Sequence, residues 1–282
     1  LASCWVQAQV RCDLNGKSQH ELGPSGRFVR PVSAPYFHED SFITTDLRGW
    51  HLIHQFDDDT IGGEVTVTAL QARLAITESV QLVAYKDGYT DFKKTTLNNI
   101  GVVDNGWNDI GAGLKWAFLQ DWDTGLHMAV GIGYEFSLGD REVLQETNEL
   151  RLWGSVNKGW DRLHLGATVN WILAEDENKG LLGNSDMVTL HAHADYFLNE
   201  YFSPVMEMNA YLVTDGGTVD FSGVDAVSLR GGEDEDTYTL AVGGELRPVG
   251  EMLGLRVAYE TGLGGSTSLF GDRWTFSAVY EF

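Results

Sequence analysis

Apolar and polar residues alternate strictly in two neighbouring stretches, 107–120 and 124–138. Even positions are apolar in both, and the odd positions between them are mostly polar or small. The apolar positions are Ile110, Ala112, Leu114, Trp116 and Phe118, then Leu126, Met128, Val130, Ile132, Tyr134, Phe136 and Leu138. Because a period of two separates the faces of a β-strand, the pattern predicts two strands with one apolar and one polar face, joined by a three-residue turn at 121–123.

These predicted strands are longer than the roughly 5 to 6 residues usual in soluble sheets, and they match the roughly 9 to 11 residues of a transmembrane β-strand. In a membrane the apolar face contacts lipid and the polar face lines a lumen. We expect about twelve such strands. Their ranges are 43–56, 63–77, 79–91, 107–120, 124–138, 148–158, 162–174, 187–199, 201–214, 237–247, 254–264 and 273–282. The predicted fold is all-β, a transmembrane-type antiparallel up-and-down β-barrel with an N-terminal extension.

The connections between these strands alternate between short and longer ones. The short ones are 77–79, 121–123, 158–161, 199–200 and 247–253, and the others are 57–59, 92–106, 139–147, 175–186, 215–236 and 264–272. Outer-membrane barrels have short periplasmic turns and longer external loops. The alternation therefore predicts a barrel in the bacterial outer membrane, with lipid around it.

The last predicted strand ends on an aromatic residue, with Tyr280 and Phe282 on its apolar face. This ending resembles the C-terminal signal that the barrel assembly machinery recognises in bacterial outer-membrane proteins, although the usual upstream glycine is displaced to Gly271. With the connections, the resemblance covers residues 43–282. More loosely, the run from Pro31 to Asp40 is similar to outer-membrane proteins grouped with the phenol meta-cleavage degradation pathway, which implies aromatic solutes.

Residues 1–42 form a separate N-terminal extension, because Pro24, Pro31 and Pro35 disfavour regular structure there. We expect a plug, a periplasmic tail or a donated strand, and we take the chain as mature because no signal peptide precedes it. Cys4 and Cys12 flank a short alternating segment and are candidates for a disulfide in an oxidising compartment.

A formal net charge of −22 argues against nucleic acid or an anionic membrane surface as partner, because both bind clustered Lys and Arg. The sequence has no run of 18 apolar residues, so it predicts no membrane-spanning helix. Acidic loops at 57–59, 175–178 and 232–236 offer oxygen ligands for Ca²⁺, but none has a complete calcium-loop pattern, so we expect no cofactor. Catalytic motifs such as a Gly-x-Ser-x-Gly elbow are lacking, and we expect no enzyme.

The polar phase of the strands predicts the lumen-lining residues. These candidates are Asp109, Lys115, His127, Glu135, Arg151, His164, His191, His193, Asp195, Glu207, Glu245, Arg256 and Glu260, with Asn170, Asn209, Arg247 and Arg273 on the same phase. They form either a salt-bridge network that fills the barrel or the lining of a selective conduit. His191, His193 and Asp195 share one face, but alternate residues lie about 7 Å apart and a metal needs more converging groups, so we expect no metal.

Four glycines interrupt the polar face of the central strands. Pairing across the 121–123 turn sets Gly111 near Gly133 and Gly113 near Gly131. A part of the lumen wall without side chains allows the strands to bend tightly, or it leaves space in the lumen for another segment, such as the N-terminal extension.

Two functions fit these patterns. The first is an outer-membrane, porin-like channel or transporter for small solutes, with a narrow or plugged lumen of mixed charge, because about twelve strands lie between filled and open barrels. The alternative is a structural subunit of a cell-surface or extracellular filament, built from barrels that self-associate when residues 4–12 add as a strand to a neighbour.

Overall fold

The computed structural model describes residues 26–56, 58, 62–101, 103–143, 148–175, 186–215, 236–249, 252–263 and 270–282. Strands make up most of this part of the chain. They are β1 (Asp46–Phe56), β2 (Glu64–Ala75), β3 (Val80–Lys93), β4 (Gly106–Trp107), β5 (Ile110–Asp121), β6 (Leu126–Phe136), β7 (Glu149–Trp160), β8 (Leu163–Ala174), β9 (Asp186–Tyr196), β10 (Phe202–Asp215), β11 (Thr237–Val249), β12 (Leu253–Gly262) and β13 (Phe270–Glu281). One helical turn, α2 (Thr96–Asn99), and a 3₁₀ turn, η2 (Arg141–Val143), lie in the connections. Within these ranges, no helix is long and apolar enough to cross a membrane.

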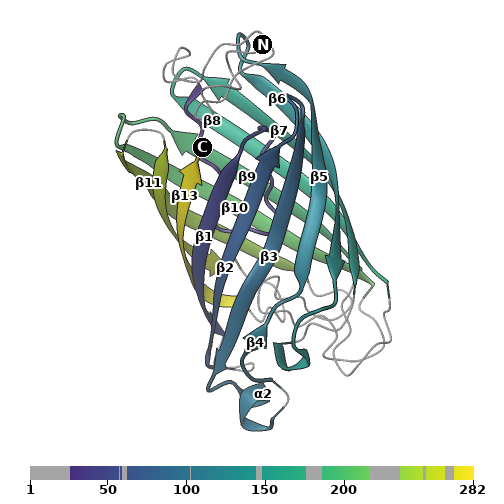
Figure 1. The fold of residues 1–282 in the computed structure, drawn as a ribbon. Coiled ribbons are helices and arrows are strands. Elements are labelled where there is room, and N and C mark those ends of the chain that lie inside the picture. Colours follow the sequence, from purple (N-terminus) through teal and green to yellow (C-terminus); the bar gives the residue numbers. More distant parts are fainter. Residues whose placement is uncertain are drawn as a thin grey trace.

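The strands close into a barrel (Figure 1). Of the 13 strands in the sheet, the two-residue β4 pairs only with β3, and the other 12 form the ring. Each pairs antiparallel with its neighbours, and β1 closes the ring against β13. Every strand range predicted from the alternation corresponds to one strand of this ring. The predicted fold class is therefore confirmed, and β4 is the addition that the pattern did not predict.

The outside of the barrel is apolar. Trp116 is 55% exposed, Ile132 48% and Val242 51%, and large apolar side chains are exposed along most of the other strands. The apolar face predicted for the stretches 107–120 and 124–138 therefore points outward. Since most of the inward neighbours of these residues are buried, the strands separate lipid-facing from luminal side chains by the alternation.

The two ends of the barrel differ as the lengths of the connections predicted. Short connections join β2 to β3, β5 to β6, β7 to β8, β9 to β10 and β11 to β12. α2 and β4 belong to the longer set and lie at the end of the barrel opposite the C-terminus (Figure 1). In an outer-membrane barrel this end faces the exterior.

The register of β5 against β6 differs from the prediction. Gly113 lies opposite Gly133, and Lys115 lies opposite Gly131. The prediction was wrong because the turn extends to Gly125, so Asp121 is the partner of Leu126, and a bulge after Ala117 shifts the register again. Gly125 has a φ of 69°, which favours glycine at this place in the turn.

Part of the barrel interior is apolar, which the alternation did not predict. On β1 the inward positions Trp50, Leu52 and Phe56 are buried, and Ile172 and Met187 lie inside at the ends of β8 and β9 that flank a longer connection. They belong to one buried cluster with residues of α2, η2 and several strands. The interior near the longer connections is thus packed with apolar side chains, and many of the charged side chains lie nearer the short turns.

Candidate functional site

Residues 26–45, called here the luminal segment, lie inside the barrel without forming a strand or an α-helix. Its side chains are almost all buried, including Phe28, Arg30, Glu39 and Asp40. Bonds reach it from β1, β2, β3, β5, β7, β8, β10, β11 and β13. The segment therefore contacts most of the circumference of the wall.

Side chains of the wall satisfy the backbone of the luminal segment. The amides of Val32 and Ser33 donate to the carboxylate of Glu207 at 2.8 and 2.6 Å. Arg151 donates to the carbonyl oxygens of Tyr36 and Phe37. Irregular backbone at membrane depth requires such partners because lipid supplies none. The wall is thus built to hold this segment.

Two carboxylates of the segment meet a group of wall cations. The Glu39 carboxylate accepts from Arg73 at 2.9 Å, and Lys115 Nζ lies 3.3 Å from Asp40 Oδ1. Arg48 lies 3.3 Å from Asp40 Oδ2. We call Arg48, Arg73 and Lys115 the cation pocket; all three side chains are buried.

The segment itself adds a fourth cation to Asp40, because Arg30 NH1 lies 2.8 Å from Oδ2. Burial alone would raise the pKa of Asp40, but Arg30, Lys115 and Arg48 outweigh it and hold this pKa well below its ordinary value. Asp40 is therefore ionised while it is docked, and it is bound as an anion.

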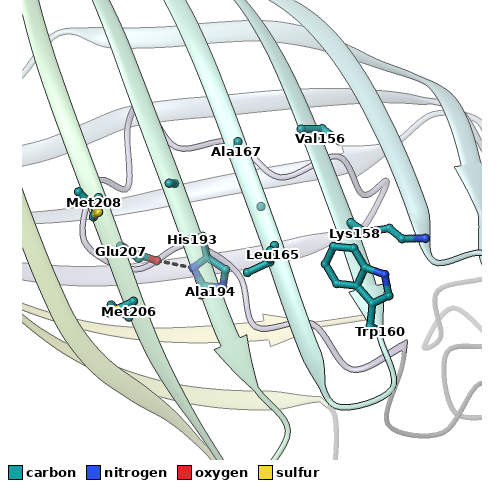
Figure 2. Close-up of a pocket in the computed structure, with 12 residues that line it drawn as sticks. Val156, Lys158, Trp160, Leu165, Ala167, His193, Ala194, Met206, Glu207 and Met208 are labelled. Atoms are coloured by element: carbon teal, nitrogen blue, oxygen red, sulfur yellow. Dashed lines mark hydrogen bonds and ion pairs between the residues drawn. The ribbon is translucent and has the colours of Figure 1, made fainter.

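Histidines and acids line the opposite side of the lumen. His193 contacts Glu207 at 2.7 Å and Asp195 at 3.2 Å, and Figure 2 draws the first of these bonds. His191 contacts Asn209 and Thr189, both at 2.8 Å. Both ring nitrogens of each histidine are thus engaged, and among the described residues no group of three or more His, Cys, Asp or Glu is placed to hold a metal ion.

His38 of the luminal segment lies against both of these histidines. Its ring centroid lies 5.3 Å from that of His191 and 6.0 Å from that of His193. Its Nδ1 is buried and makes no hydrogen bond to any described residue. Burial, together with His191, lowers the pKa of His38 well below its ordinary value, so the ring is neutral while docked.

Each lumen-lining candidate of the barrel is buried in the structure. These residues are Asp109, Lys115, His127, Glu135, Arg151, His164, His191, His193, Asp195, Glu207, Glu245, Arg256 and Glu260. Lys115, Arg151 and Glu207 bond the luminal segment directly. Others bond along the wall: Arg256 donates to Glu245 at 2.6 Å.

Aromatic rings of the segment also contact predicted residues. The Phe28 ring stacks on His164 at 4.3 Å, and the Phe42 ring lies 4.9 Å from His127. Asp109 lies away from this region, at the start of β5, where it accepts from the amide of Gly139. The structure therefore gathers most of the candidates, but not all, around one segment.

Sequence reasoning missed the cation pocket except for Lys115. Arg48 and Arg73 belong to β1 and β2, whose alternation is weak because their inward positions are partly apolar. In each of these strands one arginine occupies a position of the inward phase, and that pattern could have identified them. Glu39 and Asp40 gave no signal, because acidic residues in a proline-rich extension are ordinary.

The glycines of β5 and β6 make room for aromatic rings of the wall itself. A Cβ on Gly111 or Gly133 would overlap the ring of Tyr85, and one on Gly131 would overlap Trp153. Arg151 lies over both rings, 5.5 and 4.8 Å from their centroids. The space beside these glycines is therefore filled by aromatic rings of the wall.

Several sequence predictions lie outside the described residues. These are the disulfide candidates Cys4 and Cys12, the segment 4–12 proposed for strand donation, and most of the acidic loops considered for Ca²⁺. The assembly-signal candidates Tyr280 and Phe282 are described: both side chains are exposed at the end of the chain, with ring centroids 5.0 Å apart. Their role stays a prediction.

On the outer wall, β7 to β10 form a groove of about 390 Å³. Figure 2 shows Trp160 and Val156 toward one side of it and Met206 and Met208 toward the other. Small residues, including Ala167 and Gly166, form its floor. The groove is open to the lipid side and is separate from the cation pocket.

No protein-family model matches the sequence, and no curated protein matches it. Among solved structures, an outer-membrane channel from Pseudomonas putida F1 aligns with a TM-score of 0.63 at 10% identity, over 90% of this chain and 100% of its own. The KdgM porin, in complex with disordered oligogalacturonate, aligns with a TM-score of 0.51 at 11% identity, over 85% of this chain and 99% of its own.

At such low identity these likenesses show the fold alone. The chain has the fold of bacterial outer-membrane β-barrels of the channel and porin type. With the apolar outer wall, this fold confirms at the fold level the predicted class and the predicted location in the bacterial outer membrane.

Proposed function

We propose that the protein is an outer-membrane channel for small polar solutes, and that the luminal segment is a plug that closes it. The observation that carries the proposal is the position of residues 26–45 inside a closed barrel of channel type. The plug is held by hydrogen bonds, ion pairs and apolar contacts, such as those of Val29 and Val32 with Val205, with no covalent link among the described residues to the wall beyond the chain itself. All of these contacts are non-covalent, so they can exchange for contacts with water and solute without unfolding the barrel.

A non-enzymatic role is part of this proposal. The His, Glu and Asp side chains of the lumen bond each other or the luminal segment: His193 lies between Glu207 and Asp195, and His164 contacts Asp195 at 2.7 Å. Such pairs orient a histidine in catalytic sites, but here they lie beneath a segment of the same chain. Their arrangement fits the closure of a lumen.

Deletion of residues 26–45 tests the plug. The shortened chain should give planar-bilayer conductance several-fold above that of the wild type, because the segment no longer fills the lumen. A matched control that lacks residues 1–25 keeps the luminal segment and should conduct like the wild type. Heat-modifiable migration on gels shows whether each barrel has folded.

Equal conductance in the folded 26–45 deletion and the wild type would rule out the plug. The 1–25 deletion also bears on the alternative of strand donation, since it lacks residues 4–12. If the wild type forms filaments and this variant does not, the structural subunit becomes the better account.

A further inference from the structure

We propose that the cation pocket is the binding site for the solute, that the solute is a small organic anion with carboxylate groups, and that Glu39 and Asp40 occupy the site in its place. This inference rests on the proposed plugged channel and names its substrate class. The structure holds two carboxylates of the chain itself in a basic, buried part of the lumen. A free carboxylate would meet the same donors once the luminal segment leaves.

The pocket belongs to the wall and does not depend on the luminal segment for its shape. On β2, Arg73 lies opposite Asp46 of β1, and on β5, Lys115 lies opposite Gln81 of β3. The strands β1, β2, β3 and β5 are consecutive in the ring, so backbone pairing fixes the spacing of the cations. The donors thus stay together when the segment is displaced.

Three other luminal cations, Arg247, Arg256 and Arg273, have carboxylate partners on the wall, whereas Arg151 bonds Asn170 and carbonyl oxygens of the luminal segment. Arg256 and Arg247 both bond Glu245, at 2.6 and 2.5 Å, and Arg273 bonds Glu260 at 2.5 Å. They therefore remain neutralised whether or not the luminal segment is docked.

Lys115 differs from these cations. Among the described residues, its carboxylate partners are Asp40 at 3.3 Å and Glu39 at 3.8 Å, both on the luminal segment. Arg73 has Glu39 at 2.9 Å and, of the wall carboxylates that the structure describes, only the more distant Asp46 at 3.9 Å. Release of the segment would leave these two cations without a close anion, at high cost in a buried site.

The donors suit carboxylates, as the docked Glu39 and Asp40 show. A guanidinium presents planar paired donors that match a carboxylate, and a lysine adds a compact charge beside it. Two wall amides lie beside the cations: Gln71 donates to Pro35 O at 2.9 Å and Gln81 donates to Thr44 O at 2.7 Å. After release they are available to further oxygens of the solute. An anion that binds here competes directly with Glu39 and Asp40 and so favours opening.

Ion selectivity tests the inference. In planar bilayers with a KCl gradient, the E39Q/D40N variant should open and prefer Cl⁻ over K⁺ several-fold, because Arg73 and Lys115 have lost their close anions, whereas Arg48 keeps Asp46 at 2.8 Å. Adding R73Q/K115Q to the same chain should abolish that preference. R256Q added to E39Q/D40N instead is the matched control, and it should keep the preference because Arg256 is neutralised by Glu245.

A cation-selective E39Q/D40N pore, or anion preference that survives R73Q/K115Q, would overturn the anion site while leaving the plugged channel intact. If the E39Q/D40N variant does not fold or open, the response of the wild-type channel to succinate tests the anion site instead. Millimolar succinate should raise the open probability several-fold, and the diammonium ion putrescine should not. No response to succinate overturns the inference, whereas failure of the 26–45 deletion to conduct overturns the proposed channel itself.

Discussion

At the scale of single residues, the wall of the lumen is shaped by where side chains are missing. Gly131 and Gly133 on β6 leave space that the rings of Trp153 and Tyr85 fill. Arg151 lies over these rings and reaches the backbone of the luminal segment. The glycines of β6 thus make room for the rings over which Arg151 of β7 lies.

Adding a methyl group at Gly131 should destabilise the barrel. Gly131→Ala places a Cβ where the Trp153 ring lies, and overpacking of this kind typically costs about 1–3 kcal/mol. Urea unfolding in lipid vesicles measures the change. Gly154→Ala is the matched control, since the nearest atom to its Cβ would be 4.0 Å away. Equal stability of the two variants would contradict this account of the glycines.

His38 should make the docking of the luminal segment dependent on pH. It is neutral when docked because its pKa is held well below the ordinary value, with His191, His193, Glu207 and Asp40 around it. A released His38 regains a pKa of about 6.5 and binds a proton that the docked ring does not. Docking therefore weakens as pH falls below about 6.5, by up to roughly 1.4 kcal/mol per unit.

Open probability in planar bilayers measures this effect between about pH 7.5 and about pH 5.5, the range over which a released histidine gains its proton. The wild-type channel should open more at the lower pH. His38→Asn cannot titrate, so it should respond less to the change. Parallel pH profiles for the two proteins would show that other groups control the response.

At the scale of elements, the strands and the luminal segment satisfy the hydrogen bonds of their backbones in different ways. Strands bond each other's backbones, so their side chains are free to face lipid on one side and the lumen on the other. The luminal segment has no strand partner among the described residues, and side chains such as Glu207, Arg151 and Asn170 bond its backbone instead. Polar wall residues are therefore partly a scaffold for this segment.

A charge on the outer face of a strand should be costly in proportion to its depth in the membrane. Leu114 lies within β5 and is 47% exposed, so Leu114→Arg should lower the free energy of unfolding by about 2–4 kcal/mol. Leu138, 72% exposed and beyond the end of β6, is the control, and Leu138→Arg should cost about 0–1 kcal/mol. Urea unfolding in vesicles compares them. Similar costs at both positions would mean that this face does not contact lipid.

At the scale of the whole molecule, the interior is divided along and across the barrel. Apolar side chains such as Trp50, Leu52 and Ile172 fill the part near the longer connections. The cation pocket lies on β1, β2 and β5, and His193, Glu207 and Asp195 lie across the lumen from it. A chain with a net charge of −22 thereby keeps a basic site inside, because local pairing and not total charge sets the field that a solute meets.

The alternation of side chains determined much of this protein without any tertiary information. It located each strand of the ring, assigned Trp116 and Ile132 to the lipid face and Lys115 to the opposite face, and separated short from longer connections. These features are local, because a period of two fixes which face of a strand a residue occupies. The same pattern does not say which residue of another strand lies opposite.

Only the tertiary structure decided the partners. The turn at Gly125 and the bulge after Ala117 set Gly113 opposite Gly133, and a shift of this kind leaves no trace in the hydrophobic pattern. Glu39 meets Arg73 across 34 residues of sequence, and Asp40 meets Lys115 across 75. Such contacts depend on closing the ring around the luminal segment. The sequence therefore predicts the wall from local periodicity, whereas the occupied site inside it exists only once the barrel has closed.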